Sequence, residues 1–116
     1  MRAIMRGKRY AIGLDFGTNS VRALVVDVSN GREVGTAVWN YEHGEAGILL
    51  SRDPKLARQH PADYVKGTEM SIKKALAQAR RAVRGFRPDQ VIGIGVATTG
   101  STPIPVNENG RPLAFR

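Results

Sequence analysis

An unbroken run of apolar and glycine residues, Val91 to Ala97, is the strongest structural signal in this chain. Such a run, without polar alternation, is typical of a strand in a parallel sheet that is buried on both faces. Ahead of it, apolar side chains recur at every third or fourth position after Pro61, which predicts an amphipathic helix ending near Gly85. A helix that leads into such a strand predicts a crossover between parallel strands, and therefore an α/β sheet. The periodicity assigns these positions to the buried face of the helix: Val65, Thr68, Ile72, Ala75, Leu76, Ala79 and Val83.

Three more strands are predicted ahead of the helix. Tyr10 to Asp15 and Val21 to Val28 are apolar runs, and the small and polar residues between them predict a tight turn. Asn30-Gly31 then signals a hairpin, because both residues of a short turn must tolerate a positive φ angle. The third strand, Glu33 to Tyr41, should therefore run antiparallel to the second, and the sheet should be mixed with an initial antiparallel meander. His43 to His60 lacks periodicity and predicts a long loop.

Composition limits the classes of function. The chain has 116 residues, of which 41% are hydrophobic and 24% charged, as in one folded domain. Spanning a membrane takes about 20 consecutive apolar residues, and no such stretch occurs. The first ten residues are basic and lack the apolar core of a secretion signal. The chain contains no cysteine, so we expect a cytoplasmic location and no thiolate metal site. The net charge of +8 favours polyanionic partners, such as nucleic acid, nucleotide phosphates or an anionic membrane surface.

Several polar residues have ordinary structural interpretations. The densest basic stretch, from Lys73 to Arg87, predicts a solvated helix face, because no aromatic residues alternate with the charges as in single-strand binders. A small basic nucleic-acid-binding domain stays open as the alternative from another class. His43 and His60 have no partners at metal-ligand spacing, and His60 is expected to help begin the helix. Asp27 is expected to be a turn residue.

The segment from Asp15 to Ser20 has the strongest chemical potential. A carboxylate at a strand end is followed at once by the small residues of a turn. Backbone N–H groups and hydroxyls of such a turn bind phosphate oxygens, and a neighbouring carboxylate holds hydrated Mg²⁺. An ordinary hairpin with a polar turn has the same spacing, so these residues alone leave both readings open.

The longer run from Ile12 to Asp27 resembles the first phosphate motif of the FGGY carbohydrate kinases, of which actins and ATP-driven chaperones share a looser version. Arg58 to Tyr64 and Gly93 to Pro103 resemble the ribulokinase branch of that family. The resemblance implies a ribonuclease H-like (actin-like ATPase) fold, in which residues 1–9 are a basic extension and residues 10–116 an incomplete part of the first domain.

The same resemblance implies ATP and Mg²⁺ as cofactors, and transfer of the γ-phosphoryl group of ATP to L-ribulose to give L-ribulose 5-phosphate. Another FGGY sugar kinase, such as a xylulokinase, is the nearest alternative. Asp15 would hold the metal, and Arg22 would reach the transferring phosphoryl group. The phosphate path would be lined by Gly17, Thr18, Asn19 and Ser20. The sugar would lie against Thr98, Thr99, Gly100 and Ser101.

One residue departs from the ribulokinase pattern. Many ribulokinases have an aspartate where this chain has Ala97, so a polar contact near the sugar or a structural brace is in question. The general base and the adenine pocket of the family belong to later parts of the fold, and a noncatalytic, kinase-derived module is a further alternative. We expect a truncated chain that is inactive alone, forms homo-oligomers, and has neither nucleic acid nor membrane as a partner.

Overall fold

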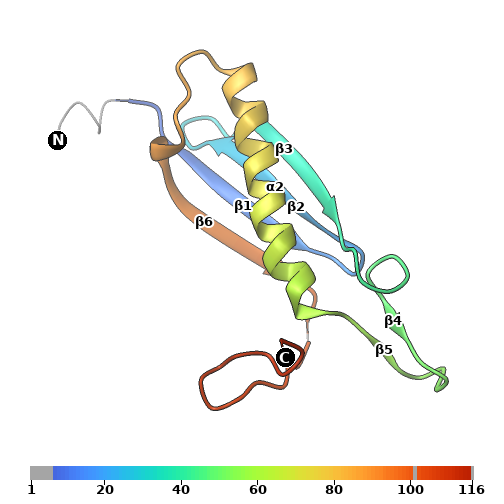
Figure 1. Ribbon diagram of the computed structural model, residues 1–116. Coiled ribbons are helices and arrows are strands. Elements are labelled where there is room, and N and C mark those ends of the chain that lie inside the picture. The colour runs from blue at the N-terminus through green and yellow to red at the C-terminus, as the bar shows by residue number, and fades with distance from the viewer. Residues whose placement is uncertain (1–6, 101, 116) are drawn as a thin grey trace.

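The computed structural model describes residues 7–100 and 102–115. It has four long strands and one long helix: β1 (Tyr10–Phe16), β2 (Ser20–Asp27), β3 (Glu33–Asn40), α2 (Pro61–Ala82) and β6 (Val91–Thr98). The long strands form one sheet in the order β3-β2-β1-β6, and α2 lies across one face of it (Figure 1). Two short strands, β4 (Leu49–Leu50) and β5 (Ala57–Arg58), pair separately, and a 3₁₀ turn, η1 (Pro88–Gln90), leads into β6.

The predicted topology is confirmed. β1 pairs antiparallel with β2, and β2 pairs antiparallel with β3, which is the expected meander. β6 lies parallel to β1, so α2 is the connection between two strands that point the same way. Phe16 at the end of β1 pairs with Thr98 at the end of β6, and both strands therefore end at one edge of the sheet.

The connection between β2 and β3 differs from the predicted tight turn. Only Gly31 has a positive φ angle there, at 74°, and its N–H donates to the Asp27 carbonyl at 2.8 Å. The N–H of Asp27 donates to the carbonyl of Arg32 at 2.9 Å, so the loop is longer than a two-residue hairpin. The Asp27 carboxylate accepts from the hydroxyl and the N–H of Ser29, which lowers its pKa, and the predicted turn role is confirmed.

Small residues bring α2 very close to the sheet. The buried positions of the helix include Gly67, Ser71, Ala75 and Ala79, spaced four residues apart on one face. A Cβ atom at Gly67 would lie 2.6 Å from Val21 Cγ1, so the helix surface touches β2 directly there. The prediction that Val65 faces the core is wrong, because its side chain is 62% exposed. Close contact selects the small side chains, and the larger ones lie beside the contact or outside it.

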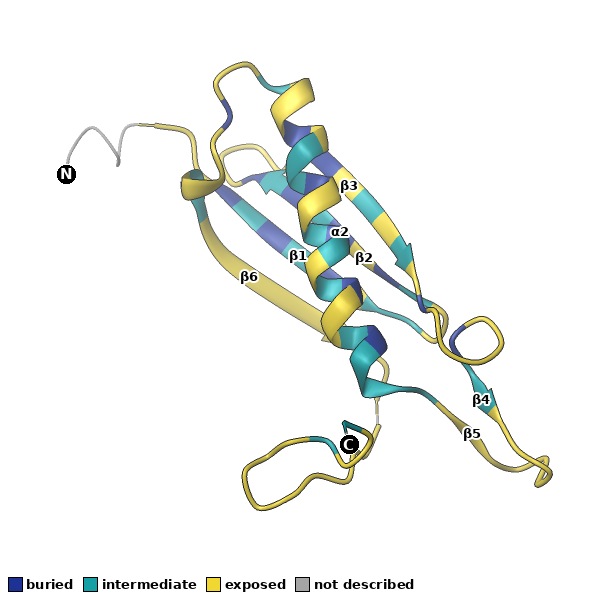
Figure 2. Ribbon diagram, viewed as in Figure 1, coloured by how far each residue is buried: buried dark blue, intermediate teal, exposed yellow. Residues whose placement is uncertain are grey.

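The core fills the space between α2 and the sheet, as the dark residues of Figure 2 show. Alternate residues of each strand point to this side because successive side chains in a strand face opposite ways. At one end of the core, the rings of Tyr10 and Phe86 pack edge to face at 4.9 Å between centroids. The buried apolar residues are Tyr10, Ile12, Leu14, Val21, Ala23, Val25, Val34, Tyr41, Ala75, Ala79 and Phe86.

The prediction that β6 is buried on both faces is wrong for this chain. Its side chains Ile92, Ile94 and Val96 are 61%, 57% and 64% exposed. Ile94 and Val96 pair with Ile12 and Leu14 of β1, so they point to the side of the sheet that carries the helix. The helix, however, packs over β2 and β3, and β6 is the edge strand (Figure 2). Among the described residues, no element covers it.

The start of α2 is tied to the loop before it. The His60 side chain accepts from the N–H of Ala62 at 3.1 Å, so the prediction that His60 helps begin the helix is confirmed. The predicted loop before it contains the β4–β5 hairpin.

Neither α2 nor any other helix in the described part of the chain is long and apolar enough to cross a membrane.

Asp63 lies in the first turn of α2, where a negative charge interacts favourably with the helix dipole, and it has further partners. It is buried and accepts from the N–H groups of Glu42 and His43, and from His43 Nδ1 at 2.6 Å. Burial alone would raise the pKa of Asp63, but the hydrogen bonds from the His43 side chain and the two N–H groups outweigh it, and the pKa is lowered. The His43 and His60 rings stack at 4.0 Å between centroids.

Candidate functional site

The residues that the family resemblance assigns to the phosphate path and to the sugar belong to two loops at the same edge of the sheet. One is the phosphate turn, defined here as Phe16 to Ser20, and the other begins at Thr99. The N–H of Thr99 donates to the carbonyl of Phe16 at 3.2 Å, so the loops are in direct contact. Loops at the carboxyl ends of neighbouring parallel strands are the usual ligand sites of open α/β sheets. Ser101 lies outside the described residues.

Asp15, next to the phosphate turn, has a paired residue on each of the two strands that flank β1. It is opposite Arg22 on β2 and opposite Ala97 on β6, and all three are exposed. Because Leu14 points into the core, Asp15 points to the face of the sheet without the helix. A carboxylate and a guanidinium therefore share one open face at the strand ends. No hydrogen-bond donor contacts the Asp15 carboxylate within residues 7–100 and 102–115, which leaves its oxygens open to a cation.

Every backbone carbonyl of the phosphate turn accepts a hydrogen bond from the surrounding protein. The donors are backbone N–H groups for Phe16, Asn19 and Ser20, and side chains for Gly17 and Thr18. In order along the turn the donors are Thr99 N (3.2 Å), Tyr41 Oη (3.1 Å), Gln59 Nε2 (2.6 Å), Tyr41 N (2.9 Å) and Gly17 N (2.8 Å). The negative ends of these peptide groups are therefore engaged with the body of the domain.

The N–H groups of the same turn are less occupied. In the described part of the chain, the N–H groups of Thr18 and Asn19 have no acceptor. The side chain of Asn19 is engaged, because its Nδ2 donates to the carbonyl of Ala46 at 2.6 Å. Two free donors beside an open carboxylate are what the phosphate groups of a Mg²⁺–nucleotide require, so the residues present fit ATP and Mg²⁺. For Asn19, the free donor is the backbone and not the side chain.

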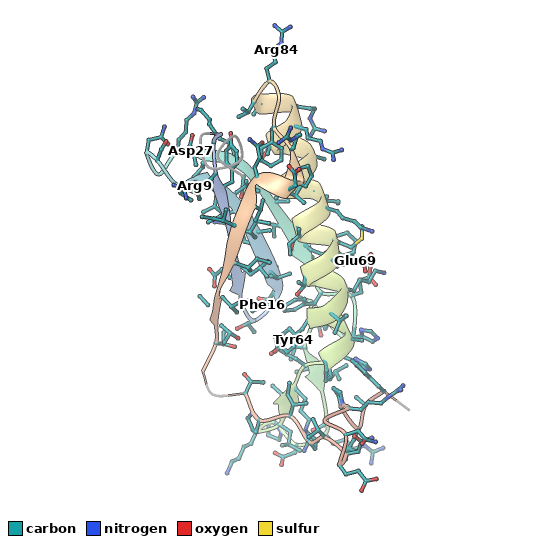
Figure 3. All side chains as sticks on the ribbon, turned by 90° about the vertical axis from the view of Figure 1, so that its left-hand side faces the viewer. Arg9, Phe16, Asp27, Tyr64, Glu69 and Arg84 are labelled. Carbon is teal, nitrogen blue, oxygen red and sulfur yellow. The ribbon has the colours of Figure 1, made fainter. Side chains whose placement is uncertain are left out.

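An aromatic cluster of Phe16, Tyr41 and Tyr64 packs beside the phosphate turn. Tyr64, on α2, faces Phe16 at the end of β1, with the ring centroids 5.8 Å apart and the rings edge to face (Figure 3). Tyr64 also packs edge to face on Tyr41 at 5.5 Å. Burial, with smaller contributions from Tyr64, Asp63 and Asp15, raises the pKa of Tyr41 to about 12. The Tyr41 hydroxyl therefore stays protonated at neutral pH and keeps donating to the Gly17 carbonyl.

Two hollows adjoin the cluster. The first, about 450 Å³, is lined by Phe16, Tyr64, Val96, Thr98, Thr99, Gly100, Thr102 and Ile104. The second, about 860 Å³, includes Gln59, His60, Tyr64, Thr102 and Ile104 in its wall. Three of the four residues expected to contact sugar, Thr98, Thr99 and Gly100, thus line a hollow next to the phosphate turn. Hydroxyls on an apolar floor are suited to a small polyol.

The sequence profile of the FGGY family of carbohydrate kinases, N-terminal domain, matches residues 10–115. The chain belongs to the FGGY family of carbohydrate kinases. It is 40% identical over 115 residues to the ribulokinase of Vibrio parahaemolyticus, and the aligned segment covers 99% of this chain and 20% of that protein. It is 41% identical over 112 residues to the ribulokinase of Halalkalibacterium halodurans, covering 92% and 19%. The chain thus spans about one fifth of the length of these curated relatives.

Two solved kinase structures have the same fold. A gluconate kinase from Lactobacillus acidophilus aligns with a TM-score of 0.68 at 18% identity, covering 92% of this chain and 19% of that one. A xyloylose kinase from Brucella ovis aligns with a TM-score of 0.58 at 24% identity, covering 78% and 16%. At these identities the likeness concerns the fold, and the expected actin-like ATPase architecture is confirmed.

Sequence reasoning missed three side chains of this FGGY domain that hold the turn: Tyr41, Gln59 and Tyr64. Gln59 and Tyr64 belong to the stretch from Arg58 to Tyr64 that resembles ribulokinases, so their importance was signalled without their contacts. Tyr41 was placed at the end of a strand, and no local pattern indicates that its hydroxyl reaches a turn more than 20 residues away in sequence.

Proposed function

We propose that this chain is the part of an ATP-dependent ribulokinase that binds the phosphates of ATP and one side of L-ribulose. One observation carries the proposal. All five carbonyls of the phosphate turn are engaged by the protein, while the N–H groups of Thr18 and Asn19 remain without an acceptor among the described residues, beside the open carboxylate of Asp15. The ribulokinase relatives, at about 40% identity, support the choice of sugar.

In this proposal the residues of the turn act mainly by position and charge. The N–H groups of Thr18 and Asn19 would donate to phosphate oxygens, with Gly17 and Ser20 completing the path. Asp15 would hold Mg²⁺, which when bound neutralises negative charge on the phosphates. Arg22, opposite Asp15 on β2, would reach the transferring phosphoryl group. Phosphoryl transfer depends chiefly on such positioning and electrostatic stabilisation.

The sugar would occupy the hollow beside β6. Thr98 and Thr99 supply hydroxyls, and Gly100 has open space around its Cα, where a Cβ would meet nothing within 4 Å. Ser101, outside the described residues, keeps the role proposed for it from the family resemblance. The phosphate turn touches this loop through Phe16 and Thr99, so donor and acceptor would meet at one sheet edge. A cytoplasmic location, where ATP is supplied, is part of the proposal.

The test is an ADP-release assay on a full-length kinase that carries this domain, with L-ribulose, D-xylulose and no sugar. L-ribulose should give the highest kcat/KM. A higher value for D-xylulose would move the proposal to another FGGY sugar kinase, and the absence of any sugar-dependent turnover would overturn it.

The same assay on the 116-residue chain alone should show no sugar-dependent turnover. In-line transfer needs donor, metal and acceptor held together, and the family resemblance implies that the general base belongs to a later part of the fold. Sugar-dependent turnover by the isolated chain would contradict the assignment of that base to the rest of the kinase.

A further inference from the structure

We propose that Gln59 is a positioning residue that links the sugar hollow to the phosphate turn and fixes the direction of the Asn19 N–H group. The inference rests on the proposed function, because it gives Gln59 a part in the phosphoryl transfer assigned above. Gln59 lies just before α2 and is separated from the turn by about 40 residues of sequence.

The amide of Gln59 joins two structures at once. Its Nε2 donates to the carbonyl of Thr18 at 2.6 Å, and its Oε1 accepts a short hydrogen bond from the hydroxyl of Tyr64. The Thr18 carbonyl determines which way the Gln59 amide is turned, because a carbonyl oxygen only accepts and therefore needs the NH₂ group of the amide opposite it. A flipped amide would leave the Thr18 carbonyl without a donor, whereas the Tyr64 hydroxyl can donate or accept, so the carbonyl gives the bridge its one orientation.

The bond to the Thr18 carbonyl acts on the next N–H group. A trans peptide unit is planar, and its C=O and N–H bonds point in opposite directions. Holding the Thr18 carbonyl against Gln59 therefore points the Asn19 N–H away from Gln59. The Tyr41 hydroxyl holds the Gly17 carbonyl in the same way and so orients the N–H of Thr18. Each of the two N–H groups is thus oriented by one side chain: that of Thr18 by Tyr41, and that of Asn19 by Gln59.

The other end of the bridge is in the wall of the sugar hollow. Tyr64 lines both hollows, together with residues of the Thr98 to Ile104 loop. Burial, with a smaller contribution from Asp63, raises the pKa of Tyr64, so its hydroxyl remains a donor at neutral pH. A sugar that packs against Tyr64 would restrict the ring, and the restriction would pass through Gln59 to the phosphate turn.

The test compares two variants of Gln59 with one control variant of Gln90, each in a full-length kinase that carries this domain. Gln59→Met keeps the length of the side chain and removes both hydrogen bonds. Gln90→Met is the matched control: Gln90 also bridges two segments, donating to Lys8 O at 3.1 Å and accepting from Arg87 N at 2.8 Å, but at the opposite end of the sheet. Gln59→Glu is the second variant, because a carboxylate accepts from Tyr64 and cannot donate to Thr18.

We expect Gln59→Met and Gln59→Glu to lower kcat by roughly two- to tenfold, the effect of one net hydrogen bond, with the KM for L-ribulose changed less than about twofold. Gln90→Met should leave kcat and the KM values for L-ribulose and ATP unchanged, even if it lowers the unfolding temperature as much as Gln59→Met does. Equal kcat for Gln59→Met and Gln90→Met would overturn the positioning role while leaving the kinase assignment intact.

A second measurement tests the link itself. In amide NMR spectra of the isotope-labelled chain, L-ribulose at millimolar concentration should shift the Thr99, Gly100 and Asn19 resonances. In Gln59→Met the Thr99 and Gly100 shifts should remain, and the Asn19 shift should be lost. An Asn19 shift that survives the substitution would refute the link. If no resonance of the unsubstituted chain responds, the sugar site of the proposed function fails, and the inference fails with it.

Discussion

The backbone of Gly35 on β3 lies so close to α2 that a Cβ atom there would be 2.2 Å from the carbonyl oxygen of Ala75. Gly35→Ala should therefore force helix and sheet apart, and overpacking of this kind costs about 1–3 kcal/mol in unfolding free energy. Urea unfolding followed by circular dichroism measures it. Gly13→Ala is the control, because a Cβ at Gly13 meets nothing within 4 Å. Equal stability of the two variants would contradict the close contact.

Asp15→Ala should lower kcat of a full-length kinase by about a hundredfold or more, the size seen when one electrostatic contact to a transition state is removed. Binding of L-ribulose should change little, because the metal acts mainly as charge develops during transfer. Steady-state kinetics with varied Mg²⁺ and calorimetric sugar titration separate the two effects. Asp89→Ala, which replaces an exposed aspartate within η1 at the opposite end of β6, should leave kcat unchanged. An unchanged kcat for Asp15→Ala would refute the metal role.

Ala97→Asp restores the residue that many ribulokinases have, and we expect it to alter either the KM for L-ribulose or the stability. Ala97 is paired with Asp15 across β1 and β6, so the new carboxylate would stand beside an existing one. Like charges at that distance repel, and the unfolding temperature should fall without Mg²⁺ and recover when Mg²⁺ is added. Ala97→Asn, which adds no charge, is the control. If neither KM nor stability changes, the departure from the family pattern is neutral.

Asp63 should make the fold sensitive to acid. Its pKa is lowered from the ordinary 3.8, so its ionised form stabilises the fold above that pH, and this contribution is lost as the pH falls through the lowered value. Asp63→Asn should destabilise the protein at pH 7 by about 1–3 kcal/mol, because donors contact both carboxylate oxygens and the NH₂ group that replaces one of them cannot accept. The variant should also lose less stability between pH 5 and pH 2 than the unsubstituted chain. Equal acid sensitivity in urea titrations would count against this interpretation.

The exposed edge strand should make the isolated chain self-associate. Ile92, Ile94 and Val96 present an apolar strand whose outer edge has no partner in the described residues. Unpaired apolar edges add further strands readily, and lysine on such an edge prevents it. Ile94→Lys should shift the chain towards monomer in size-exclusion chromatography, while Val65→Lys, at an equally exposed site on the outer face of α2, should not. The same elution for all three proteins would rule out β6 as the contact.

Much of the fold could be predicted from local patterns. The apolar runs, the turn residues and the spacing after Pro61 are properties of short segments, and the structure places the strands and the helix within a few residues of the predicted bounds. The errors came from contacts between distant segments. Val65 matched the apolar period, yet helix and sheet meet through Gly67 and Ala75, because the distance between backbones and not the period decides which side chains fit.

The exposure of β6 has a related cause. The apolar run is typical of a strand covered on both faces, but among the described residues α2 packs over β2 and β3 and leaves Ile92, Ile94 and Val96 exposed. In the site, Asp15 and the phosphate turn were identified from their spacing, whereas Gln59 and Tyr41 act through side chains from remote segments. A pattern within six residues reveals a turn, but the groups that orient it are known only once the chain is folded.

The five anchored carbonyls of the phosphate turn also bear on the order in which the domain folds. Their donors come from the turn itself, the end of β3, the segment before α2 and the end of β6, which together span most of the chain. The β1–β2 hairpin forms from neighbouring residues, but its turn acquires its final geometry only after those later segments have docked. A partly folded chain would therefore contain the motif before its turn has the geometry that these hydrogen bonds fix.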